Sequence, residues 1–253
     1  MTLQGKKGLI VGIANAHSIA FGCAEAFKNA GAELAVTYLN AKAEPFVRPL
    51  AEQLQSPIIV PCDVREPGQL EDVFARIQRD WGRLDFLLHS IAYAPKEDLH
   101  CRITDCSQAG FNMAMDVSCH SFIRMARLAE PLMAAGGCLL TVTFYGAEKV
   151  VADYNMMGPV KAALESTTRY MAAELGAKRI RVHALSPGPL KTRAASGIDR
   201  FDELLERART RTPEHQLVTI EDVGNLAAFL VSDAAASLTG NIEYIDAGYH
   251  IVG

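Results

Sequence analysis

Patterns that identify disulfide-bonded, zinc-binding and membrane-spanning proteins are missing from this sequence. The six cysteines stand singly, and no two form a C-x-x-C pair. Disulfide frameworks and structural zinc sites normally show such pairing, so we expect the reduced thiols of a cytoplasmic protein and no metal site. No apolar run approaches the roughly 20 residues of a membrane span. The first residues also lack the apolar stretch of about 7–15 residues that marks a secretory signal.

Clustered basic charge is equally scarce. The 25 Lys and Arg residues are outnumbered by 29 Asp and Glu residues, and no more than two basic residues follow one another. Nucleic acid is bound through clustered positive charge, so no such partner is expected. The seven histidines also stand singly. His17 and His89 could touch a ligand, but we expect both to be structural. The 253 residues, 49% hydrophobic and 21% charged, have the composition of an ordinary globular protein that can bury a core.

Short apolar runs alternate with amphipathic segments from end to end. Runs such as Leu9–Val11 and Phe86–Leu88 are apolar on successive residues, which predicts burial on both faces, as in a parallel sheet covered by helices. Strands are predicted at Gly8–Val11, Glu33–Leu39, Ile58–Cys62, Leu84–His89, Cys138–Phe144, Arg181–Ser186 and Ile242–Asp246.

Helical patterns fill the intervals between these strands. They cover Ile19–Ala30, Lys42–Leu54, Pro67–Trp81, Gln108–Met133, Met157–Leu175, Phe201–Arg209 and Ile220–Val231. Alternation of strands and helices is typical of a doubly wound sheet. We therefore predict an α/β protein: a single-domain Rossmann fold over residues 1–253, with seven parallel strands and helices on both faces.

The first predicted strand ends in a turn of small residues, Gly12–Gly22, directly before a helix. A Rossmann fold binds pyrophosphate at this point, because small residues admit the ligand to backbone N–H groups at the positive end of the helix dipole. The spacing is longer than G-x-G-x-x-G. We predict contacts to a nicotinamide dinucleotide from Gly12, Ala14, Ser18 and Ile19, with the Ser18 hydroxyl capping the helix and donating to phosphate.

The ends of the next three strands extend this predicted coenzyme site. The second strand ends at Leu39 without the acid that favours NAD or the arginine that favours NADP; the missing guanidinium favours NADH, and Lys42 leaves NADPH open. Asp63, followed by Val64, ends the third strand and would either accept from the adenine amino group or cap the next helix. The fourth strand is followed by Ser90, Ile91 and Ala92. The small residues in this segment would let the ribose of the coenzyme lie against the backbone.

Tyr154 and Lys161 are the residues predicted to carry the proton chemistry. Seven residues span nearly two helical turns, so both side chains would project from one helix face, and Gly158 and Pro159 suit its first turn. A phenol has an ordinary pKa near 10, which a neighbouring ammonium would lower. An isolated pair at this spacing is more often a surface lysine and an unrelated tyrosine, but the phosphate turn and the position after the fifth strand favour a joint role.

Four pieces of the sequence together resemble one known family. The pieces are Gly12 through Gly22, Ser90–Pro95, Tyr154–Gly158 with Lys161, and Ser186–Thr192 with Ala194–Ile198. Nearly the whole chain resembles the short-chain dehydrogenase/reductase superfamily, and more narrowly the bacterial enoyl-acyl-carrier-protein reductases. Most members that act on ketones or alcohols place the tyrosine and lysine four residues apart and carry Asn-Asn-Ala-Gly after the fourth strand. The spacing of seven and the Ser-Ile-Ala found here both favour the enoyl reductase branch.

The resemblance implies a reaction, a cofactor and a partner. NADH would reduce the trans-2 double bond of an enoyl thioester, carried by acyl carrier protein or coenzyme A, in fatty-acid elongation. Tyr154 would hydrogen-bond the thioester oxygen as it gains negative charge, and Lys161 would bind the nicotinamide ribose. Further contacts would come from Leu190, Thr192 and Ala194 on the cofactor and from Tyr93, Ala94, Phe144 and Met157 on the substrate.

Phe144 departs from many members of that family, which carry a second tyrosine at this position. Tyr145 is adjacent, but alternation along a strand would point it to the opposite face. Mycobacterial members resemble this chain in carrying Phe here, so we interpret Phe144 as a hydrophobic wall.

Two expectations and two alternatives complete the prediction. Residues 194–216 are charged and helical in pattern, and would form either a mobile lid over the acyl chain or an ordinary surface helix. The family commonly forms homotetramers, and we expect one here. The alternatives are a short-chain dehydrogenase acting on a ketone or alcohol, and a catalytically idle nucleotide sensor, against which the intact Tyr154 and Lys161 argue.

Overall fold

Seven parallel strands form the centre of the computed structural model, which describes residues 2–190 and 201–252. They lie in the order β3-β2-β1-β4-β5-β6-β7, and every neighbouring pair is parallel. Their bounds are β1 Lys7–Val11, β2 Glu33–Tyr38, β3 Ile58–Pro61, β4 Phe86–His89, β5 Gly137–Val142, β6 Ile180–Pro187 and β7 Ile242–Ile245. The predicted Rossmann fold is confirmed. The strand order reverses between β1 and β4, and ligands of such sheets bind at the carboxyl ends of the strands at this switch point.

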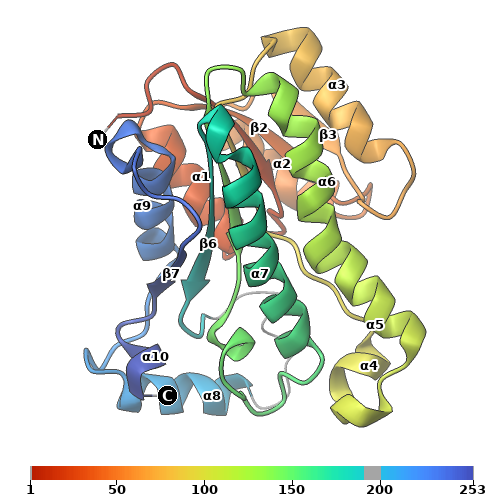
Figure 1. Ribbon diagram of the computed structural model, residues 1–253, viewed down its shortest axis with the longest axis vertical. Helices are drawn as coiled ribbons and strands as arrows, with labels where there is room; N and C mark the ends of the chain where they lie inside the picture. The colour runs from red at the N-terminus through yellow and green to blue at the C-terminus, as the bar shows by residue number, and fades with distance from the viewer. Residues whose placement is uncertain (1, 191–200, 253) are drawn as a thin grey trace.

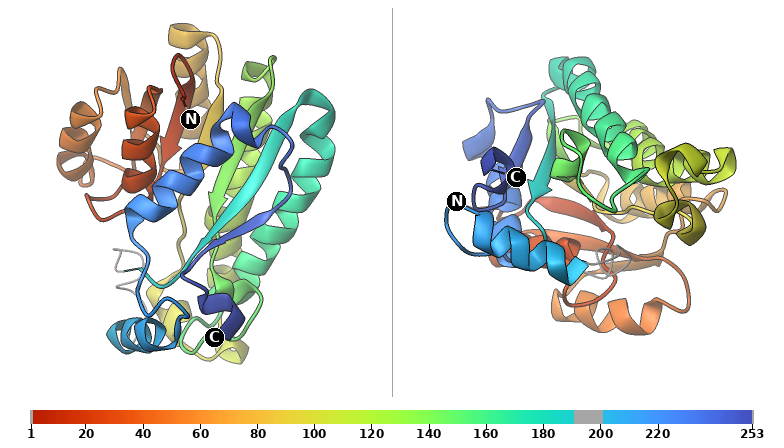
Figure 2. Two further views of the ribbon diagram at one scale, coloured as in Figure 1. Left: turned by 90° about the vertical axis from the view of Figure 1, so that its left-hand side faces the viewer. Right: turned by 90° about the horizontal axis from the view of Figure 1, so that it is seen from below.

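Helices cover both faces of the sheet (Figures 1 and 2). One face packs against α1 (Ile19–Asn29), α2 (Glu44–Gln53) and α9 (Ile220–Val231), and the other against α3 (Gln69–Trp81), α6 (Ser121–Ala129) and α7 (Met157–Leu175). Successive strand residues enter alternate cores: Leu9 packs on the α3 side and Ile10 on the α1 side. This two-sided burial is the reason the strands are apolar on consecutive residues.

The predicted helix over Gln108–Met133 is interrupted. The structure has α5 (Gln108–Met115), a π-helical segment η2 (Asp116–His120), then α6 and a short 3₁₀ turn, η3 (Glu130–Leu132). Within the π-helical segment the buried Ser118 accepts from the Tyr93 N–H at 3.0 Å and donates to the Tyr93 carbonyl at 3.2 Å. A wide turn of this kind spans only five residues, too few for sequence periodicity to reveal it.

Several short elements gather where the strands end. In Figure 1 the arrow of β6 points toward the lower end of the molecule, where α4 (Lys96–His100), α8 (Phe201–Arg211) and α10 (Tyr249–Val252) lie. Two 3₁₀ turns, η1 (Ile103–Asp105) and η4 (Tyr145–Ala147), belong to the segments that follow β4 and β5. The predicted α8 is confirmed. The other four were not predicted, because segments of five residues or fewer carry no measurable period.

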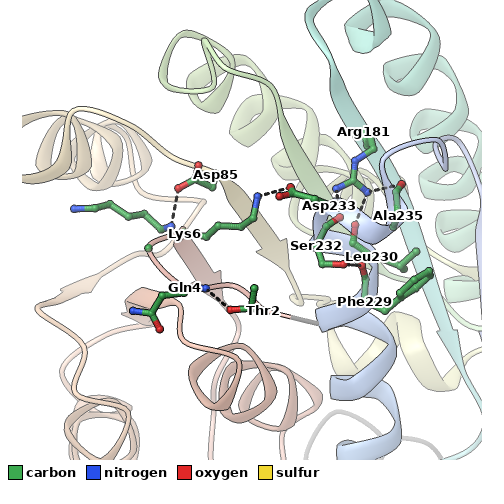
Figure 3. A network of polar contacts seen from close by, with 12 residues as sticks. Thr2, Gln4, Lys6, Asp85, Arg181, Phe229, Leu230, Ser232, Asp233 and Ala235 are labelled. Atoms are coloured by element: carbon green, nitrogen blue, oxygen red, sulfur yellow. Dashed lines mark hydrogen bonds and ion pairs between the residues drawn. The ribbon is translucent and has the colours of Figure 1, made fainter.

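A polar network braces the amino-terminal side of the sheet (Figure 3). Lys6 donates to the carboxylate of Asp233 at 2.7 Å. Arg181, near the start of β6, points its guanidinium at the end of α9 and donates to the main-chain carbonyls of Leu230, Ser232 and Ala235. A cation that satisfies carbonyls at a helix C-terminus stabilises the helix through both hydrogen bonds and its dipole. The network ties the two halves of the sheet together at the edge opposite the strand ends.

The structure can also be examined for disulfides, metal sites and membrane-spanning helices, for which the sequence shows no pattern. All six cysteines are free thiols. No group of three His, Cys, Asp or Glu side chains within residues 2–190 and 201–252 is placed to hold a metal ion. None of the helices in these ranges combines the length and apolar character that crossing a membrane would need.

Candidate active site

Gly12 ends β1 in a conformation that requires glycine. Its φ is +122°, and a Cβ atom there would lie 2.1 Å from the carbonyl oxygen of Ser90. Ser90 follows β4, and its N–H donates to the Val11 carbonyl at 2.9 Å. The main chains of the two strand ends are therefore in close contact at the switch point, and any larger residue at position 12 would force them apart.

Ser18 occupies the N-cap position of α1, but its side chain does not cap the helix. The Ser18 Oγ instead accepts from the N–H groups of Ala14 and Asn15, both at 3.0 Å. The prediction of a hydroxyl cap is wrong, because the preceding turn folds back and uses the oxygen. The first turn of α1 thus keeps N–H groups without a side-chain cap, the arrangement that binds an anion.

Asp63 follows β3 and forms a salt bridge with Arg65, two residues further along the chain. It is 7% exposed, and its two oxygens accept from the guanidinium of Arg65 at 2.9 and 2.6 Å. This contact holds the pKa of Asp63 below its usual range, against the opposing effect of burial. Because α3 begins only at Gln69, with Gly68 at its N-cap, the alternative in which Asp63 caps that helix is wrong.

A cavity of about 330 Å³ opens at the carboxyl ends of β4, β5 and β6, next to the turn before α1. The predicted site residues that line it are Ile19, Ser90, Ile91, Ala92, Tyr93, Ala94, Phe144, Tyr154, Met157, Lys161 and Leu190. Those outside its lining, on the turn or at the ends of β2 and β3, are Gly12, Ala14, Ser18, Leu39, Asp63 and Val64. Thr192 and Ala194 lie outside the described residues.

Tyr154 lies in a turn that precedes α7, not within the helix. The helix begins at Met157, and the residues on either side of the tyrosine, Asp153 and Asn155, have positive φ values of +62° and +43°. The prediction that two helical turns align Tyr154 with Lys161 is therefore wrong in its geometry. The Asn155 amide donates to the Leu99 carbonyl at 3.0 Å and anchors this turn to α4.

Lys161 is held at the end of β5. It is 6% exposed, and its Nζ donates to the carbonyl of Val142 at 2.7 Å. Since Tyr154 and Lys161 both line the cavity, the structure brings the predicted pair together, although by a turn and a helix rather than by one helix face.

Burial dominates the electrostatics of this pair. Burial, and then the charge of Glu165, raise the pKa of the Tyr154 hydroxyl above its ordinary value. Burial lowers the pKa of Lys161 to about 8. The prediction that the ammonium lowers the tyrosine pKa is wrong here, because loss of hydration outweighs the neighbouring charge. At neutral pH, Tyr154 is consequently an uncharged hydrogen-bond donor and Lys161 is mostly a cation.

Phe144 and Tyr145 meet different aromatic rings. The Phe144 ring meets the Tyr154 ring edge-on, with 5.0 Å between their centroids. Tyr145 is buried, and its ring meets that of Tyr249 of α10 edge-on, with 5.7 Å between the ring centroids. Phe144 therefore places an apolar ring beside the Tyr154 phenol.

Six residues of the cavity lining were not predicted as site residues: Leu99, Val142, Thr143, Pro187, Gly188 and Pro189. All except Leu99 end or follow β5 and β6, so the rule that ligands bind at strand carboxyl ends would have found them. Leu99 lies on α4, for which the sequence carries no signal. Thr143 is buried and donates to Glu165, also buried, at 2.7 Å.

His89 lies within the core at the end of β4. Its two ring nitrogens are 2.8 Å from the hydroxyls of Thr141 and Ser121. Burial, and then the charge of Lys161, lower the pKa of His89 to about 3. The expectation of a structural histidine is confirmed.

The sheet order, the glycine-dependent turn and the cavity shared by a buried tyrosine and lysine define a dinucleotide-binding Rossmann protein of the short-chain dehydrogenase/reductase type. A family model described as Enoyl-(Acyl carrier protein) reductase matches residues 12–250. This chain belongs to that family.

Individual relatives agree along the full length. The chain is 44% identical to enoyl-(acyl-carrier-protein) reductase (NADH) 1 of Rhizobium meliloti (strain 1021), with 99% of this chain and 92% of that protein covered. A solved structure of the reductase from Anaplasma phagocytophilum in complex with NAD has a TM-score of 0.96 and 44% identity, and covers 100% of this chain and 97% of that one. The Bacillus cereus enoyl-acyl carrier protein reductase, solved with NADP+ and indole naphthyridinone, has a TM-score of 0.97 and 41% identity, with 100% of both chains covered.

Proposed function

We propose that this chain is an NADH-dependent enoyl-acyl-carrier-protein reductase, which reduces the trans-2 double bond of an enoyl thioester. The observation that carries the proposal is the buried Tyr154 hydroxyl, which shares one cavity with Lys161 beside the turn before α1. The relatives of R. meliloti and Aquifex aeolicus bear the name of this NADH-dependent activity, the second at 45% identity over 99% of this chain and 93% of that protein.

The described residues fit a nicotinamide dinucleotide. A Cβ at Gly12 would fill the space between the ends of β1 and β4, and the first turn of α1 has no side-chain cap, so a pyrophosphate can approach both. When bound, NADH supplies the hydride. After β2, the Asn40 side chain accepts from the N–H groups of Lys42 and Ala43. With no guanidinium in that turn, we favour NADH over NADPH.

Tyr154 supplies the electrostatic part of the reaction. As the thioester oxygen gains enolate character, the Tyr154 hydroxyl donates a hydrogen bond to it from a fixed position out of water. Its raised pKa keeps the proton on the phenol until charge develops. The α-carbon then receives a proton from Tyr154, or from solvent through it. Lys161 binds a ribose hydroxyl and keeps a positive charge beside the phenol.

The remaining contacts are assigned by position. On the cofactor we place the strand-end residues Leu39, Asp63, Val64, Ser90, Ile91, Ala92 and Leu190, with Thr192 and Ala194. On the acyl chain we place Tyr93, Ala94, Phe144 and Met157, whose side chains are mostly apolar and line the cavity. Phe144 leaves Tyr154 without a second phenol at the neighbouring position, which makes Tyr154 the donor to the thioester oxygen.

The wider setting is also proposed. We infer one domain, a cytoplasmic homotetramer, and a role in fatty-acid elongation with acyl carrier protein or coenzyme A as the carrier. Residues 194–216 would cover the substrate. In support, α8 lies at the end of the molecule toward which the arrow of β6 points (Figure 1), and its buried Ala208 packs in one cluster with Tyr145 and Tyr249.

A paired coenzyme and substrate assay tests the proposal. NADH and NADPH oxidation are followed at saturating crotonyl thioester and, separately, acetoacetyl thioester. We expect NADH to be oxidised with the crotonyl substrate and not with the acetoacetyl one. Oxidation with acetoacetyl thioester would instead indicate a carbonyl-reducing dehydrogenase, and coenzyme binding without oxidation of either would indicate a nucleotide sensor.

A further inference from the structure

Two neighbouring residues at the end of β5 are bonded to two residues of α7 that lie one helical turn apart. The Val142 carbonyl accepts from Lys161 at 2.7 Å, and the next residue, Thr143, donates its hydroxyl to the Glu165 carboxyl, also at 2.7 Å. Val142, Thr143 and Lys161 all line the cavity. The four residues form a closed frame that fixes the strand end against the helix.

Glu165 is an unusual member of this frame, because it is only 9% exposed. Burying a carboxyl group costs hydration, which a glutamine of the same shape would largely avoid while still accepting from Thr143. Burial raises the pKa of Glu165, and the Thr143 hydrogen bond opposes that rise. For the fold alone, a carboxylate here would gain only its attraction to Arg169, set against the cost of burial.

The buried ammonium of Lys161 supplies a reason for the charge. Burial favours its neutral form, whereas Cys119 and Glu165 act in the opposite direction and favour the cation. The other titratable groups around the frame lie on several elements. Tyr154 precedes α7, and His89 of β4 is neutral above its pKa of about 3. Facing Glu165 are Arg169 of α7, Glu148 after η4 and Tyr244 of β7.

We propose that Glu165 is a positioning residue for the reductase: its carboxylate, held by the Thr143 hydroxyl, keeps the Lys161 ammonium charged and seated at the end of β5 beside Tyr154. The inference rests on the proposed function, since it concerns the same cavity. Glu165 lies outside the cavity lining and acts through Lys161 and Thr143, while its charge also opposes ionisation of the Tyr154 hydroxyl. Its contribution is therefore largest where Lys161 begins to lose its proton.

Glu165→Gln tests this directly, because it removes the charge and keeps both the shape and the acceptor for Thr143. The alkaline limb of the kcat/KM profile with crotonyl thioester should move to lower pH, by roughly half a unit to one unit. On that limb kcat/KM falls about three- to tenfold below the parent enzyme, while the two agree near pH 6. A limb that coincides with that of the parent, or moves upward, overturns the proposal.

A second readout does not depend on turnover. NADH binding, followed by fluorescence as a function of pH, should lose affinity at a lower pH in Glu165→Gln than in the parent, because a neutral Lys161 binds the ribose less well. Unchanged pH dependence of binding counts against Glu165 even if the parent proves inactive with enoyl thioesters. Inactivity of the parent would refute only the proposed function.

Matched variants complete the design. Glu174→Gln removes an exposed carboxylate from the same helix, and should leave both pH profiles unchanged. Glu165→Asp keeps the charge but withdraws it by one methylene, and should shift the limb less than Glu165→Gln does. If Glu165→Gln does not fold, as judged by thermal melting, a Glu165→Asp profile identical to that of the parent overturns the proposal.

Discussion

At the scale of single residues, burial decides what each ionisable group can do. Tyr154 and Lys161 are chemically an acid with an ordinary pKa near 10 and a base with one slightly above it. Burial moves them in opposite directions, raising the pKa of Tyr154 and lowering that of Lys161 to about 8. The phenol thus remains a donor across the physiological range, while the lysine charge becomes sensitive to mild alkali.

Tyr154→Phe should reduce kcat by roughly 100- to 1,000-fold, because it deletes one preorganised donor to the thioester oxygen. The phenylalanine keeps the ring that packs against Phe144, so the melting temperature should change little. Steady-state kinetics and NADH titration separate the two effects. Unchanged turnover would contradict the role given to the hydroxyl, and lost NADH binding would show that the variant disturbs the coenzyme site instead.

His89 should make the protein sensitive to acid. Its pKa is about 3 in the folded chain and about 6.5 when exposed, so the unfolded state binds the proton preferentially below pH 6.5. Stability is lost as pH falls, with about 2 kcal/mol gone between pH 6.5 and 5 from this group alone. Urea unfolding across that range measures the loss, and His89→Gln should show a shallower slope. Equal slopes would exclude His89 as the cause.

At the scale of elements, helix and strand ends place the site and secure the fold at opposite edges of the sheet. The carboxyl ends of β4, β5 and β6 line the cavity, and the turn that we propose to bind phosphate begins where β1 ends. The amino-terminal edge carries the network of Lys6, Asp233 and Arg181 (Figure 3). We therefore expect mutations at the two edges to affect function and stability separately.

Arg181→Met should lower the free energy of unfolding by about 2 kcal/mol, since a charged donor to several main-chain carbonyls is lost. The side chain lies away from the cavity, so kcat/KM should stay within about twofold of the parent at a temperature where both remain folded. Arg79→Met, at a side chain 68% exposed on α3, is the matched control and should be nearly neutral. A similar loss in both variants would contradict the capping role.

At the scale of the whole molecule, the described surface leaves several large apolar side chains in water. Tyr170 of α7 is 78% exposed, Ile123 of α6 is 40% exposed and Ile251 of α10 is 70% exposed. Packing long helices and carboxyl-terminal segments against copies of the chain would cover such groups.

Sedimentation velocity over a range of concentrations should therefore give a species of about 110 kDa, four times the 27.4 kDa chain. Tyr170→Glu on α7 should shift the distribution toward smaller species, because it places a charge in the expected contact. Arg102→Glu is the control, because it changes an exposed side chain outside the helices of the expected contact. This variant should sediment as the parent does. A monomer at micromolar concentration would contradict the proposed tetramer.

The sequence by itself determined the architecture and selected the tyrosine and lysine that we propose as the reacting pair. Consecutive apolar residues such as Leu9 and Ile10 indicated a sheet buried on both faces. The alternation of strands and helices then predicted a doubly wound sheet. Gly12 after the first strand and Tyr154 with Lys161 after the fifth fall at positions that such a sheet brings to one edge, so local pattern and strand order together were sufficient to select them.

Only the tertiary structure decided how those residues are presented and charged. The left-handed turn at Asp153 and Asn155 and the wide turn at Ser118 leave no periodic trace in the sequence, and the partners of Ser18 and Asp63 depend on loop paths. In the sequence, nothing distinguishes Glu165 from the other glutamates of the predicted helices. Its burial against Thr143, and with it the balance of charge around Lys161, follows from contacts between segments far apart in the chain, where loss of hydration outweighs the intrinsic chemistry of each residue.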